Sequence, residues 1–429
     1  MIANIPETDL KRIVIIGAGF AGLKLAQKLL KSKYQVVLID KENYHSFQPL
    51  MYQVATAGLE PSSIAFPLRK LFQHEKNFHI RNDEVISIDT ENKNIRLKNI
   101  GKVNFDKLVI SFGADTNYFG NAKMQQFSMP MKSISEALAL RNRILEDYEK
   151  AISITDYDAR QELLDIVIVG GGATGVEIAG ALADMKQYIL PKDYNEIDRD
   201  EVDIYLVDAG DKLLSTLSEK SSMTAEKSLL EMGVKVIKNT VVKDYDGNVA
   251  TFSDGTTIRT KMVIWAAGII ARALEGMPAD AYGRGRRLLV NEFNQLTNFP
   301  DIYAIGDCAL MITEAKPNGD PQVAQVAIQQ AVNLAKNLKN IQENKPLKPF
   351  KYKDLGNMAT IGRKKAVAEL PGFKFNGFFA WLTWLFVHLM AILGTKNKIF
   401  IFINWAWSYI TRDQSLRLIM KPKEKGKSD

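Results

Sequence analysis

The sequence predicts an α/β fold with two Rossmann-like dinucleotide-binding domains and a C-terminal helical module. Three observations carry this prediction. A glycine-rich fingerprint stands at 17–22, a second copy stands at 170–175, and the last 80 residues are unusually aromatic. At 429 residues, with 46% hydrophobic and 24% charged content, the chain is long enough for two or three globular domains.

Both fingerprints stand where a nucleotide would bind. The first reads Gly17-Ala18-Gly19-Phe20-Ala21-Gly22 and the second reads Gly170-Gly171-Gly172-Ala173-Thr174-Gly175. Each follows an apolar run (13–16 and 166–169) that predicts a buried strand, and each precedes a helix-forming stretch. The glycines allow a tight turn and a close approach of backbone to a pyrophosphate at the helix N-terminus. Two copies predict a flavin and a nicotinamide held face to face. We assign FAD to the N-terminal copy and NADH to the other.

Acidic residues follow both fingerprints. A strand at 35–39 ends at Asp40, where a carboxylate is expected to hold a ribose hydroxyl of FAD. A strand at 202–207 ends at Asp208, later than usual because a polar segment at 184–200 intervenes. Asp208 would repel a 2′-phosphate, which favours NADH over NADPH, although Lys212 leaves the strictness of that preference open.

Cysteine and histidine usage narrows the chemistry. Cys308 is the only cysteine, which excludes a disulfide framework and a cysteine metal cluster. The segment 44–53 has no sulfur except a methionine, so reduced flavin must pass electrons directly to an acceptor. Cys308 is interpreted as a small buried hydrophobe rather than a reactive thiol. The four histidines have no metal-ligand spacing, and we expect no metal site.

Three further segments read as strands that close on glycine turns. They are expected to bring Gly113, Gly306 and Asp307 to FAD and Gly268 to NADH. A helix is expected next, with Asp320 as its N-cap and Pro321 in its first turn. Gln322, Gln325 and Gln329 would share one face of it. They are either solvated polar residues or amides for a quinone carbonyl, and the pattern alone does not decide.

The C-terminal segment combines aromatic and basic residues. Two apolar runs, 378–393 and 399–410, are separated by 394–398 and contain Trp381, Trp384, Trp405 and Trp407. Both are too short to cross a bilayer, so we interpret them as helices lying in a membrane interface, assisted by the lysine-rich tail 421–427. The alternative is a pair of core or dimer-interface helices. The formal charge of +7 is modest, and no nucleic-acid partner is expected.

The chain resembles type II NADH dehydrogenases, the single-subunit, non-proton-pumping NADH:quinone oxidoreductases, over almost its full length. The resemblance rests on both fingerprints, 43–45 with 49–55, 304–307, the Ala-Gln-x-Ala-x-Gln-Gln run at 324–330 and Ala-Thr-Ile-Gly-Arg at 359–363. It implies FAD in a discontinuous domain (1–118 and 290–350), NADH at 119–289, and membrane anchoring through 351–429. It also implies a homodimer at the cytoplasmic face of the membrane. Ala331 departs from the family, in which many members carry glycine.

The resemblance assigns candidate catalytic residues. Gln325 and Gln329 match the family's quinone-site glutamines, and Glu177 matches its nicotinamide-side glutamate. A carboxylate so close to the pyrophosphate loop is expected to face the flavin side and accept a hydrogen bond from the carboxamide of NADH. The expected reaction is hydride transfer from NADH to FAD, followed by two-electron reduction of quinone without proton pumping. The alternatives are a soluble flavoprotein reductase of a small iron–sulfur or rubredoxin-type protein and a non-catalytic NADH/FAD redox sensor.

Overall fold

The computed structural model describes residues 3–413 and 416–421. The chain folds into two compact units, each assembled from three separate stretches. The first unit comprises Met1–His45, Phe66–Asp115 and Ile269–Leu355. The second comprises Ser46–Ala65, Thr116–Gly268 and Gly356–Asp429.

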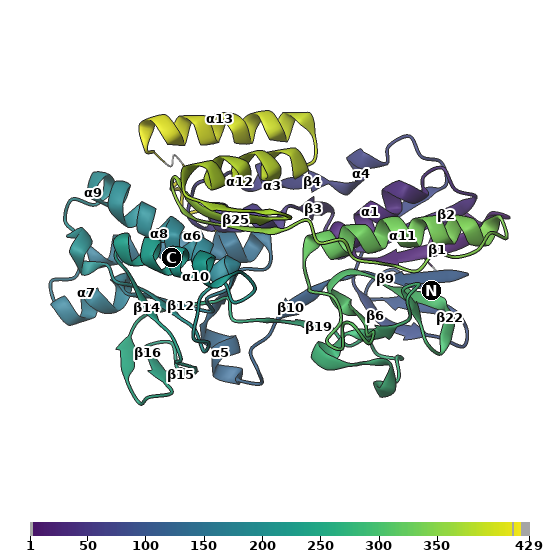
Figure 1. Ribbon diagram of the computed structural model, residues 1–429, viewed down its shortest axis with the longest axis horizontal. Coiled ribbons are helices and arrows are strands. Elements are labelled where there is room, and N and C mark those ends of the chain that lie inside the picture. Colours follow the sequence, from purple (N-terminus) through teal and green to yellow (C-terminus); the bar gives the residue numbers. More distant parts are fainter. Residues whose placement is uncertain (1–2, 414–415, 422–429) are drawn as a thin grey trace, which may run out of the picture. The chain divides into compact units, whose positions relative to one another are not determined.

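The first unit is built on a sheet of eight strands (Figure 1). Its central strand β1 (Lys11–Ile16) lies parallel to β2 (Tyr34–Asp40) on one side and to β9 (Lys107–Ile110) on the other. The sheet order is β23-β20-β21-β22-β9-β1-β2-β5. The remaining strands are β5 (Phe78–Asn82), β20 (Leu288–Val290), β21 (Gln295–Leu296), β22 (Phe299–Ala304) and β23 (Ala309–Met311). Residues Ile13, Val14 and Ile15 are fully buried, which agrees with a strand in the middle of a covered parallel sheet.

Two helices pack against one another beside this sheet. They are α1 (Phe20–Leu29), which follows the first fingerprint, and α11 (Ala324–Gln342) (Figure 1). A three-stranded antiparallel sheet of β6 (Val85–Asp89), β7 (Asn94–Leu97) and β8 (Gly101–Asn104) completes the unit, together with the short helix α4 (Leu68–Leu71). The chain passes between the units at β3 (Tyr44–Ser46), β4 (Ala65–Pro67), β10 (Ala114–Thr116) and the start of β19 (Ile269–Ala271), and again after Leu355.

The start of α11 differs from the prediction. The helix begins at Ala324 after Val323, and no side chain caps it. Asp320 is buried instead, with its carboxylate 2.5 Å from Lys316 Nζ and its carbonyl accepting a hydrogen bond from Arg287. These tertiary contacts override the local capping preference, so Gln322 lies before the helix and does not share a helical face with the other glutamines.

The second unit contains a parallel sheet in the order β11-β18-β12-β13-β14. These strands are β11 (Met129–Pro130), β12 (Ile166–Val169), β13 (Ile204–Val207), β14 (Val234–Ile237) and β18 (Met262–Trp265). Helix α8 (Ala173–Tyr188) follows the second fingerprint and packs against β12, β13 and β14. A small antiparallel sheet of β15 (Val242–Tyr245), β16 (Val249–Phe252) and β17 (Thr257–Arg259) extends the unit. Its other helices are α2 (Met51–Ala55), α3 (Pro61–Ile64), α5 (Ala122–Phe127), α6 (Ile134–Ala151), α7 (Tyr157–Leu164), α9 (Leu190–Asp193) and α10 (Glu219–Glu231).

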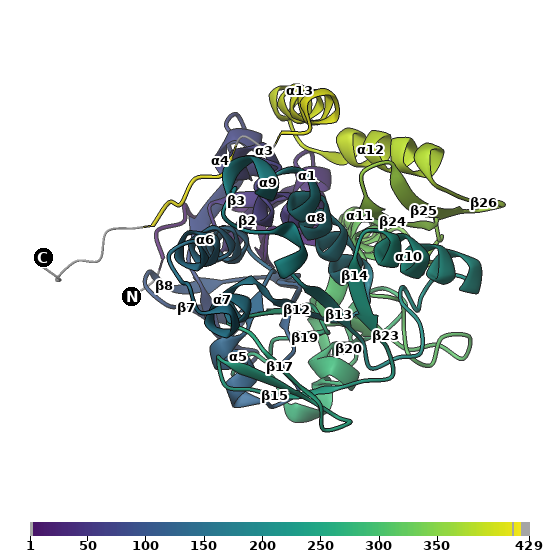
Figure 2. The same ribbon diagram turned by 90° about the vertical axis from the view of Figure 1, so that its left-hand side faces the viewer.

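The C-terminal part of the second unit is a sheet followed by two helices. Strands β24 (Asn357–Gly362), β25 (Lys365–Leu370) and β26 (Phe373–Asn376) form an antiparallel sheet that the helical prediction did not include. Helix α12 (Phe378–Ala391) packs against β25, and α13 (Thr395–Thr411) lies beside α12 (Figure 2). Both predicted helices are present, but α13 already starts within the segment 394–398 that was expected to separate them.

The described residues include no helix that is both long and apolar enough to cross a membrane. Of the predicted basic tail, Lys421 forms an ion pair with Glu146 of α6. The remaining tail residues, 422–427, lie outside the described residues.

Helix α8 is held between its parallel sheet and β24 by a close backbone approach. A Cβ on Gly180 would lie 1.7 Å from the carbonyl oxygen of Ile361 in β24, so only glycine allows this packing. Gly180→Ala should therefore lower the free energy of unfolding by about 1–3 kcal/mol, as overpacking does. Elsewhere in helices the same change stabilises by roughly 0.5–1 kcal/mol. Thermal denaturation gives the sign, and a raised midpoint would contradict this packing.

Candidate functional site

The first fingerprint forms a phosphate-binding loop at the carboxyl end of β1. Gly17 has φ of +95°, and a Cβ there would lie 2.5 Å from the carbonyl oxygen of Ser111. A Cβ on Gly22 would lie 1.8 Å from the carbonyl oxygen of Gly17, so the first turn of α1 presses on the loop. A Cβ on Gly19 would meet nothing within 4 Å. The loop is thus tight against the protein at two glycines and open at the third, where a helix N-terminus faces outward, as a bound pyrophosphate requires.

The second fingerprint repeats this geometry at the end of β12. Gly170 has φ of +111°, and its Cβ would lie 2.6 Å from the carbonyl oxygen of Ala266. A Cβ on Gly175 would lie 1.8 Å from the carbonyl oxygen of Gly170, and a Cβ on Gly172 would again meet nothing within 4 Å. The structure therefore provides two equivalent cradles, one in each unit, that fit a dinucleotide pyrophosphate.

The two aspartates occupy equivalent positions beside these loops. Asp40 accepts a hydrogen bond from the Ala18 N–H at 2.5 Å and another from the Glu42 N–H at 2.8 Å. Asp208 accepts from the Gly171 N–H at 2.5 Å and from the Gly210 N–H at 2.7 Å. Burial raises the pKa of Asp40. The extra polar segment before Asp208 forms α9 and a short 3-10 turn. The Asp208 carboxylate still lies beside the second fingerprint loop. Each aspartate braces its loop, in addition to any contact with a ribose.

The other residues assigned to FAD gather in the first unit. Gly306 has φ of +76°, and a Cβ there would lie 3.2 Å from the side chain of Ala21 in α1. Its N–H donates to the Gln330 Oε1 at 2.7 Å, and the carbonyl of Asp307 accepts from Gln322 at 2.9 Å. Gly113 has φ of +75° and open space where a Cβ would be. Gln330, which has no role in the sequence analysis, therefore holds the loop of Gly306 and Asp307 beside the first fingerprint.

Gly268, assigned to NADH, lies at the carboxyl end of the second parallel sheet. Its carbonyl accepts a hydrogen bond from the Asn117 N–H at 3.0 Å, and the Asn117 carbonyl accepts from Trp265 Nε1 at 2.8 Å. A Cβ on Gly268 would lie 3.1 Å from the ring of Phe119, whose φ is +52°. Asn117 thus fixes the turn next to the second cradle.

Two buried side chains of the first unit, Cys308 and His45, lie within hydrogen-bond distance of backbone carbonyls. Cys308 donates weak hydrogen bonds to the carbonyls of Ile110 and Ile305, and burial raises the pKa of its thiol to about 12. Cys308 is fully buried, as its interpretation as a small buried hydrophobe expects. His45 Nδ1 lies 2.9 Å from the carbonyl oxygen of Ala18, so this histidine supports the first fingerprint loop.

The candidate catalytic residues fall in different units. Gln325 and Gln329 lie on α11 of the first unit, and Glu177 lies on α8 of the second. Both ends of the Gln329 amide bind the backbone of Lys353: its Nε2 donates to the carbonyl at 2.9 Å and its Oε1 accepts from the N–H at 3.0 Å. In this structure Gln329 therefore anchors the chain segment that follows α11.

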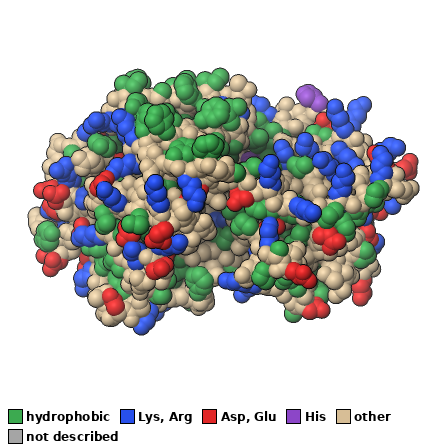
Figure 3. All heavy atoms as spheres, viewed as in Figure 1, with side chains coloured by type: hydrophobic (Ala, Val, Ile, Leu, Met, Phe, Trp, Pro, Cys, Tyr) green, Lys and Arg blue, Asp and Glu red, His purple; other side chains and the backbone are tan. Residues whose placement is uncertain are grey.

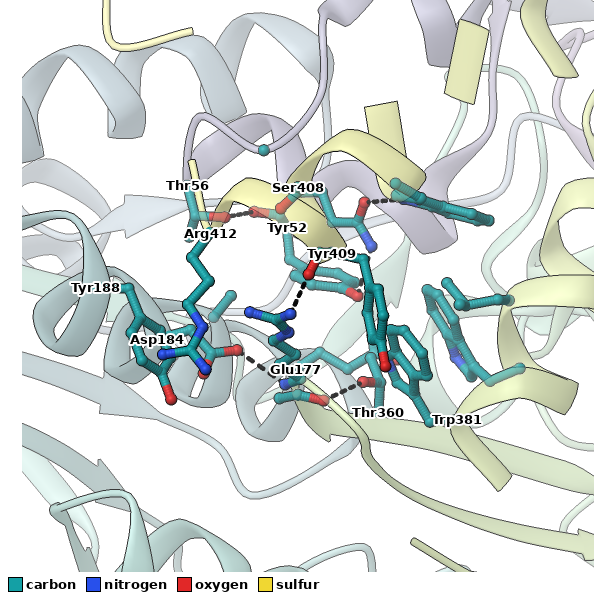
Figure 4. Close-up of a pocket in the computed structure, with 18 of the residues that line it drawn as sticks. Tyr52, Thr56, Glu177, Asp184, Tyr188, Thr360, Trp381, Ser408, Tyr409 and Arg412 are labelled. Atoms are coloured by element: carbon teal, nitrogen blue, oxygen red, sulfur yellow. Dashed lines mark hydrogen bonds between the residues drawn. The ribbon is translucent and has the colours of Figure 1, made fainter. Parts of the chain in front are cut away.

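Glu177 lies in a cavity of about 140 Å³ that belongs entirely to the second unit (Figure 4). One face of α8 contributes Glu177, Ala181, Asp184 and Tyr188. The walls come from α2, β24, α12 and α13. Their principal side chains are Tyr52, Gln53, Thr56, Thr360, Arg363, Trp381, Trp384, Leu385, Trp405, Ser408, Tyr409 and Arg412.

The carboxyls in this cavity are strongly desolvated. Burial raises the pKa of Glu177 to about 8, against the opposing effect of a hydrogen bond from the Thr360 backbone N–H. The Trp384 indole lies close to the same carboxyl, but its Nε1–H is buried without a partner of good hydrogen-bond geometry. Burial raises the pKa of Asp184 to about 6, although it accepts a hydrogen bond from the Arg363 N–H at 2.9 Å.

A hydrogen-bonded chain links the cavity to the last helix. Trp405 Nε1 of α13 donates to Gln53 Oε1 at 2.8 Å, and Gln53 Nε2 donates to the Tyr52 hydroxyl oxygen at 2.8 Å. Tyr52 is nearly fully buried.

Cations and aromatic rings surround the rest of the cavity wall. The Arg363 guanidinium lies 4.8 Å from the ring centre of Tyr409, and it donates to the Tyr409 carbonyl. The Arg412 guanidinium lies 5.1 Å from the ring centre of Tyr188 (Figure 4). Such stacked pairs combine apolar contact with electrostatic attraction.

The cavity therefore presents hydrogen-bond donors between aromatic walls. At neutral pH Glu177 is protonated, because its pKa is about 8, and it joins the Tyr52 hydroxyl and the Trp384 N–H as a donor. These donors fit a flat, uncharged ligand that accepts hydrogen bonds. The sequence analysis named Tyr52, Gln53 and Arg363 within motifs, yet it did not assign them to a shared site. No local signal marks Trp384 and Trp405 as cavity residues among so many aromatic neighbours.

Comparison with known proteins finds matches over most of the chain. A family model described as pyridine nucleotide-disulphide oxidoreductase matches residues 11–331, and one described as the NDH2 C-terminal domain matches residues 355–413. Two type II NADH:quinone oxidoreductases of Mycobacterium tuberculosis are 34% and 35% identical to the chain. The alignments cover 93% and 94% of this chain and 88% and 87% of those relatives.

The fold is also that of a solved structure. NDH2 from Plasmodium falciparum in complex with NADH superposes with a TM-score of 0.87 at 23% identity, covering 96% of this chain and 100% of that one. The predicted fold class is confirmed by this likeness.

The open glycine of each cradle gives a matched pair of tests. Gly19 and Gly172 have φ of −67° and −71°, which any residue adopts, and no protein atom occupies the position of an added Cβ. Gly19→Val and Gly172→Val should therefore fold normally and obstruct only a ligand. Gly19→Val should lose the flavin absorbance after gel filtration. Gly172→Val should keep that absorbance and lose NADH binding in a titration. If each variant lost both ligands, or neither, the assignment of the cradles would be wrong.

Proposed function

Because the chain belongs to the type II NADH:quinone oxidoreductases, we propose that it binds FAD in its first unit and NADH in its second, and reduces a membrane quinone. It is an NADH dehydrogenase that uses a flavin. When bound, the flavin supplies the two-electron carrier between the two substrates. The protein's own residues bind, orient and protonate the reactants.

Several residues of the first unit support FAD binding there. Gly19 leaves the N-terminus of α1 open to the pyrophosphate, and Asp40 and His45 hold the loop in that shape. Gln330 keeps Gly306 and Asp307 beside it. Gly172 and Asp208 give NADH the corresponding contacts in the second unit, and the Asp208 carboxylate disfavours the extra phosphate of NADPH.

The donor-lined cavity supports binding of the quinone ring. A quinone is flat and neutral, and its two carbonyls accept hydrogen bonds without donating any. The buried N–H of Trp384 carries this proposal, because the Glu177 carboxyl close to it gives it no hydrogen bond of good geometry. A buried donor left unsatisfied costs roughly 1–3 kcal/mol, which a ligand acceptor would relieve. Glu177 would supply a proton to the reduced quinone. The resemblance expects Glu177 at the nicotinamide, and its place in the cavity supports a contact with the second substrate.

The outer faces of α12 and α13 support attachment to a lipid surface. Figure 3 shows hydrophobic side chains gathered over these helices. The most exposed on the two helices are Phe379, Phe386, Met390, Ile399, Phe402, Ile403, Trp407 and Ile410, and Phe373 of β26 is exposed as well. Lysine and arginine side chains lie among them: Lys396 lies 5.4 Å from the Phe400 ring centre and Lys364 lies 5.1 Å from that of Tyr409. Apolar rings bordered by cations match an anionic lipid surface. We place this attachment at the cytoplasmic face of the membrane, with the chain as a homodimer, as the resemblance implies.

The pKa of Glu177 predicts the pH dependence of quinone reduction. A carboxyl donates a proton only while it is protonated, so kcat/KM for quinone should fall as the pH rises through about 8. Glu177→Gln should lower the rate and remove this alkaline limb. Asp184→Asn is the matched control: Asp184 lines the same cavity but titrates near 6, so the limb should remain.

Stopped-flow bleaching of the flavin by NADH separates the two possible roles of Glu177. A Glu177→Gln variant that reduces its flavin at the normal rate and is reoxidised slowly by quinone supports the role at the quinone. Slow flavin reduction with normal reoxidation would place Glu177 at the nicotinamide instead.

Charges on the apolar surface should weaken membrane binding. The double variant Phe386→Glu, Phe402→Glu puts one carboxylate on each outer helix face, where both rings are more than half exposed. We expect it to co-sediment poorly with vesicles of neutral and anionic phospholipid, whereas Met223→Glu, an equally exposed position on α10, should bind normally. High salt should release the natural chain only partly, and detergent should release it fully. Unchanged vesicle binding, with a dimer converted to monomer in gel filtration, would make this surface a contact between two copies.

A further inference from the structure

We propose that Tyr52 donates the hydrogen bond that holds a quinone carbonyl, and that Trp405 and Gln53 set the direction of its hydroxyl proton. This proposal rests on the proposed function, in which the cavity of the second unit binds quinone. Tyr52 would touch the substrate, while Gln53 and Trp405 would act through it as positioning residues.

The direction follows from the donors and acceptors along the chain. An indole N–H can only donate, so the Gln53 atom that lies 2.8 Å from Trp405 Nε1 must be the amide oxygen. The Gln53 nitrogen then faces Tyr52, and at 2.8 Å it donates to the hydroxyl oxygen. The Tyr52 hydroxyl therefore accepts from Gln53, and its own proton must point elsewhere. Because Tyr52 lines the cavity, that proton is available to a ligand there.

The surroundings of Tyr52 keep its proton in place. Burial raises the pKa of the phenol well above its ordinary value, and the carboxyl groups of Glu177 and Asp184 raise it further when they are ionised. Tyr52 is thus a neutral donor throughout the range in which Glu177 titrates. Its ring lies 6.4 Å from that of Trp384, so the two donors flank the same space.

The first member of the chain, Trp405, comes from the helix with the apolar outer face. On α13, Phe402 and Trp407 are exposed while Ile401 is buried and Trp405 turns inward to Gln53. The helix that supports membrane attachment therefore also fixes the donor that meets the substrate.

Three substitutions test this arrangement, each assayed in the full-length flavoprotein with a short-chain quinone. Tyr52→Phe removes the donor and should lower kcat/KM for quinone about three- to tenfold, the effect of one neutral hydrogen bond, without slowing flavin reduction by NADH. Gln53→Glu keeps the shape of the side chain. When the new carboxylate is ionised, it accepts hydrogen bonds from both Trp405 and Tyr52, so the Tyr52 proton points away from the cavity. This variant should lower kcat/KM to a similar extent at pH 7. Trp405→Phe frees the amide to rotate and should have a smaller effect of the same kind.

The pH profile distinguishes positioning from packing. In Gln53→Glu, protonation of the introduced carboxyl restores a donor toward Tyr52, so acidic pH should bring the rate back toward that of the natural enzyme. A packing defect would not recover. Loss of rate without recovery, or a normal rate at pH 7, would overturn the role of Gln53.

A cavity-filling variant separates failure of this inference from failure of the proposed site. Ala181 lines the cavity on α8, and Ala181→Leu should block quinone reduction while sparing flavin reduction. If Ala181→Leu blocks quinone reduction and Tyr52→Phe leaves it unchanged, the cavity is the quinone site but Tyr52 is not the hydrogen-bond donor. If Ala181→Leu also reduces quinone normally, the cavity is not the quinone site and both proposals fall.

Discussion

The second unit depends on two backbone contacts made by a single helix. At its N-terminal turn α8 presses on its own phosphate loop, because the space beside Gly175 is filled by the carbonyl of Gly170. Five residues later, Gly180 brings the carbonyl of Ile361 in β24 slightly closer still. Neither contact tolerates a side chain. The helix is thereby fixed to the nucleotide-binding sheet on one side and to the C-terminal sheet on the other, with Glu177 and Asp184 held between them.

Local patterns in the sequence predicted the parts of the molecule that local geometry determines. Both fingerprints, both aspartates and the two aromatic helices stand where their residues indicated, since a glycine turn or an apolar run fixes its own backbone. Other elements depend on distant partners. Asp320 has the features of an N-cap, yet Lys316 and Arg287 hold it away from α11. The strands at 357–376 were missed because segments of only four to six residues show little periodicity.

The cavity could not be predicted for a related reason. Its walls come from four stretches that are far apart in the chain, around residues 52–58, 177–189, 360–363 and 381–412. Two of these stretches were known only as motifs of a resemblance, and the tryptophans of a third were interpreted as membrane contacts. Trp384 and Trp405 face inward while Trp407 is exposed. Composition cannot separate such neighbours, because the direction of a side chain follows from tertiary packing.

Because the two cradles are alike, their shared geometry cannot determine which ligand each one binds. Gly17, Gly19 and Gly22 match Gly170, Gly172 and Gly175 in their close contacts with backbone, and the bracing carboxylates agree as well. A feature shared by two sites carries no information about which ligand each should prefer. Discrimination between a permanently held cofactor and an exchanging substrate must then reside where the copies have diverged: Gln330 with Gly306 in one, and Asn117 with Gly268 in the other. An ancestral duplication would account for both the sameness of the cradles and the divergence at their edges.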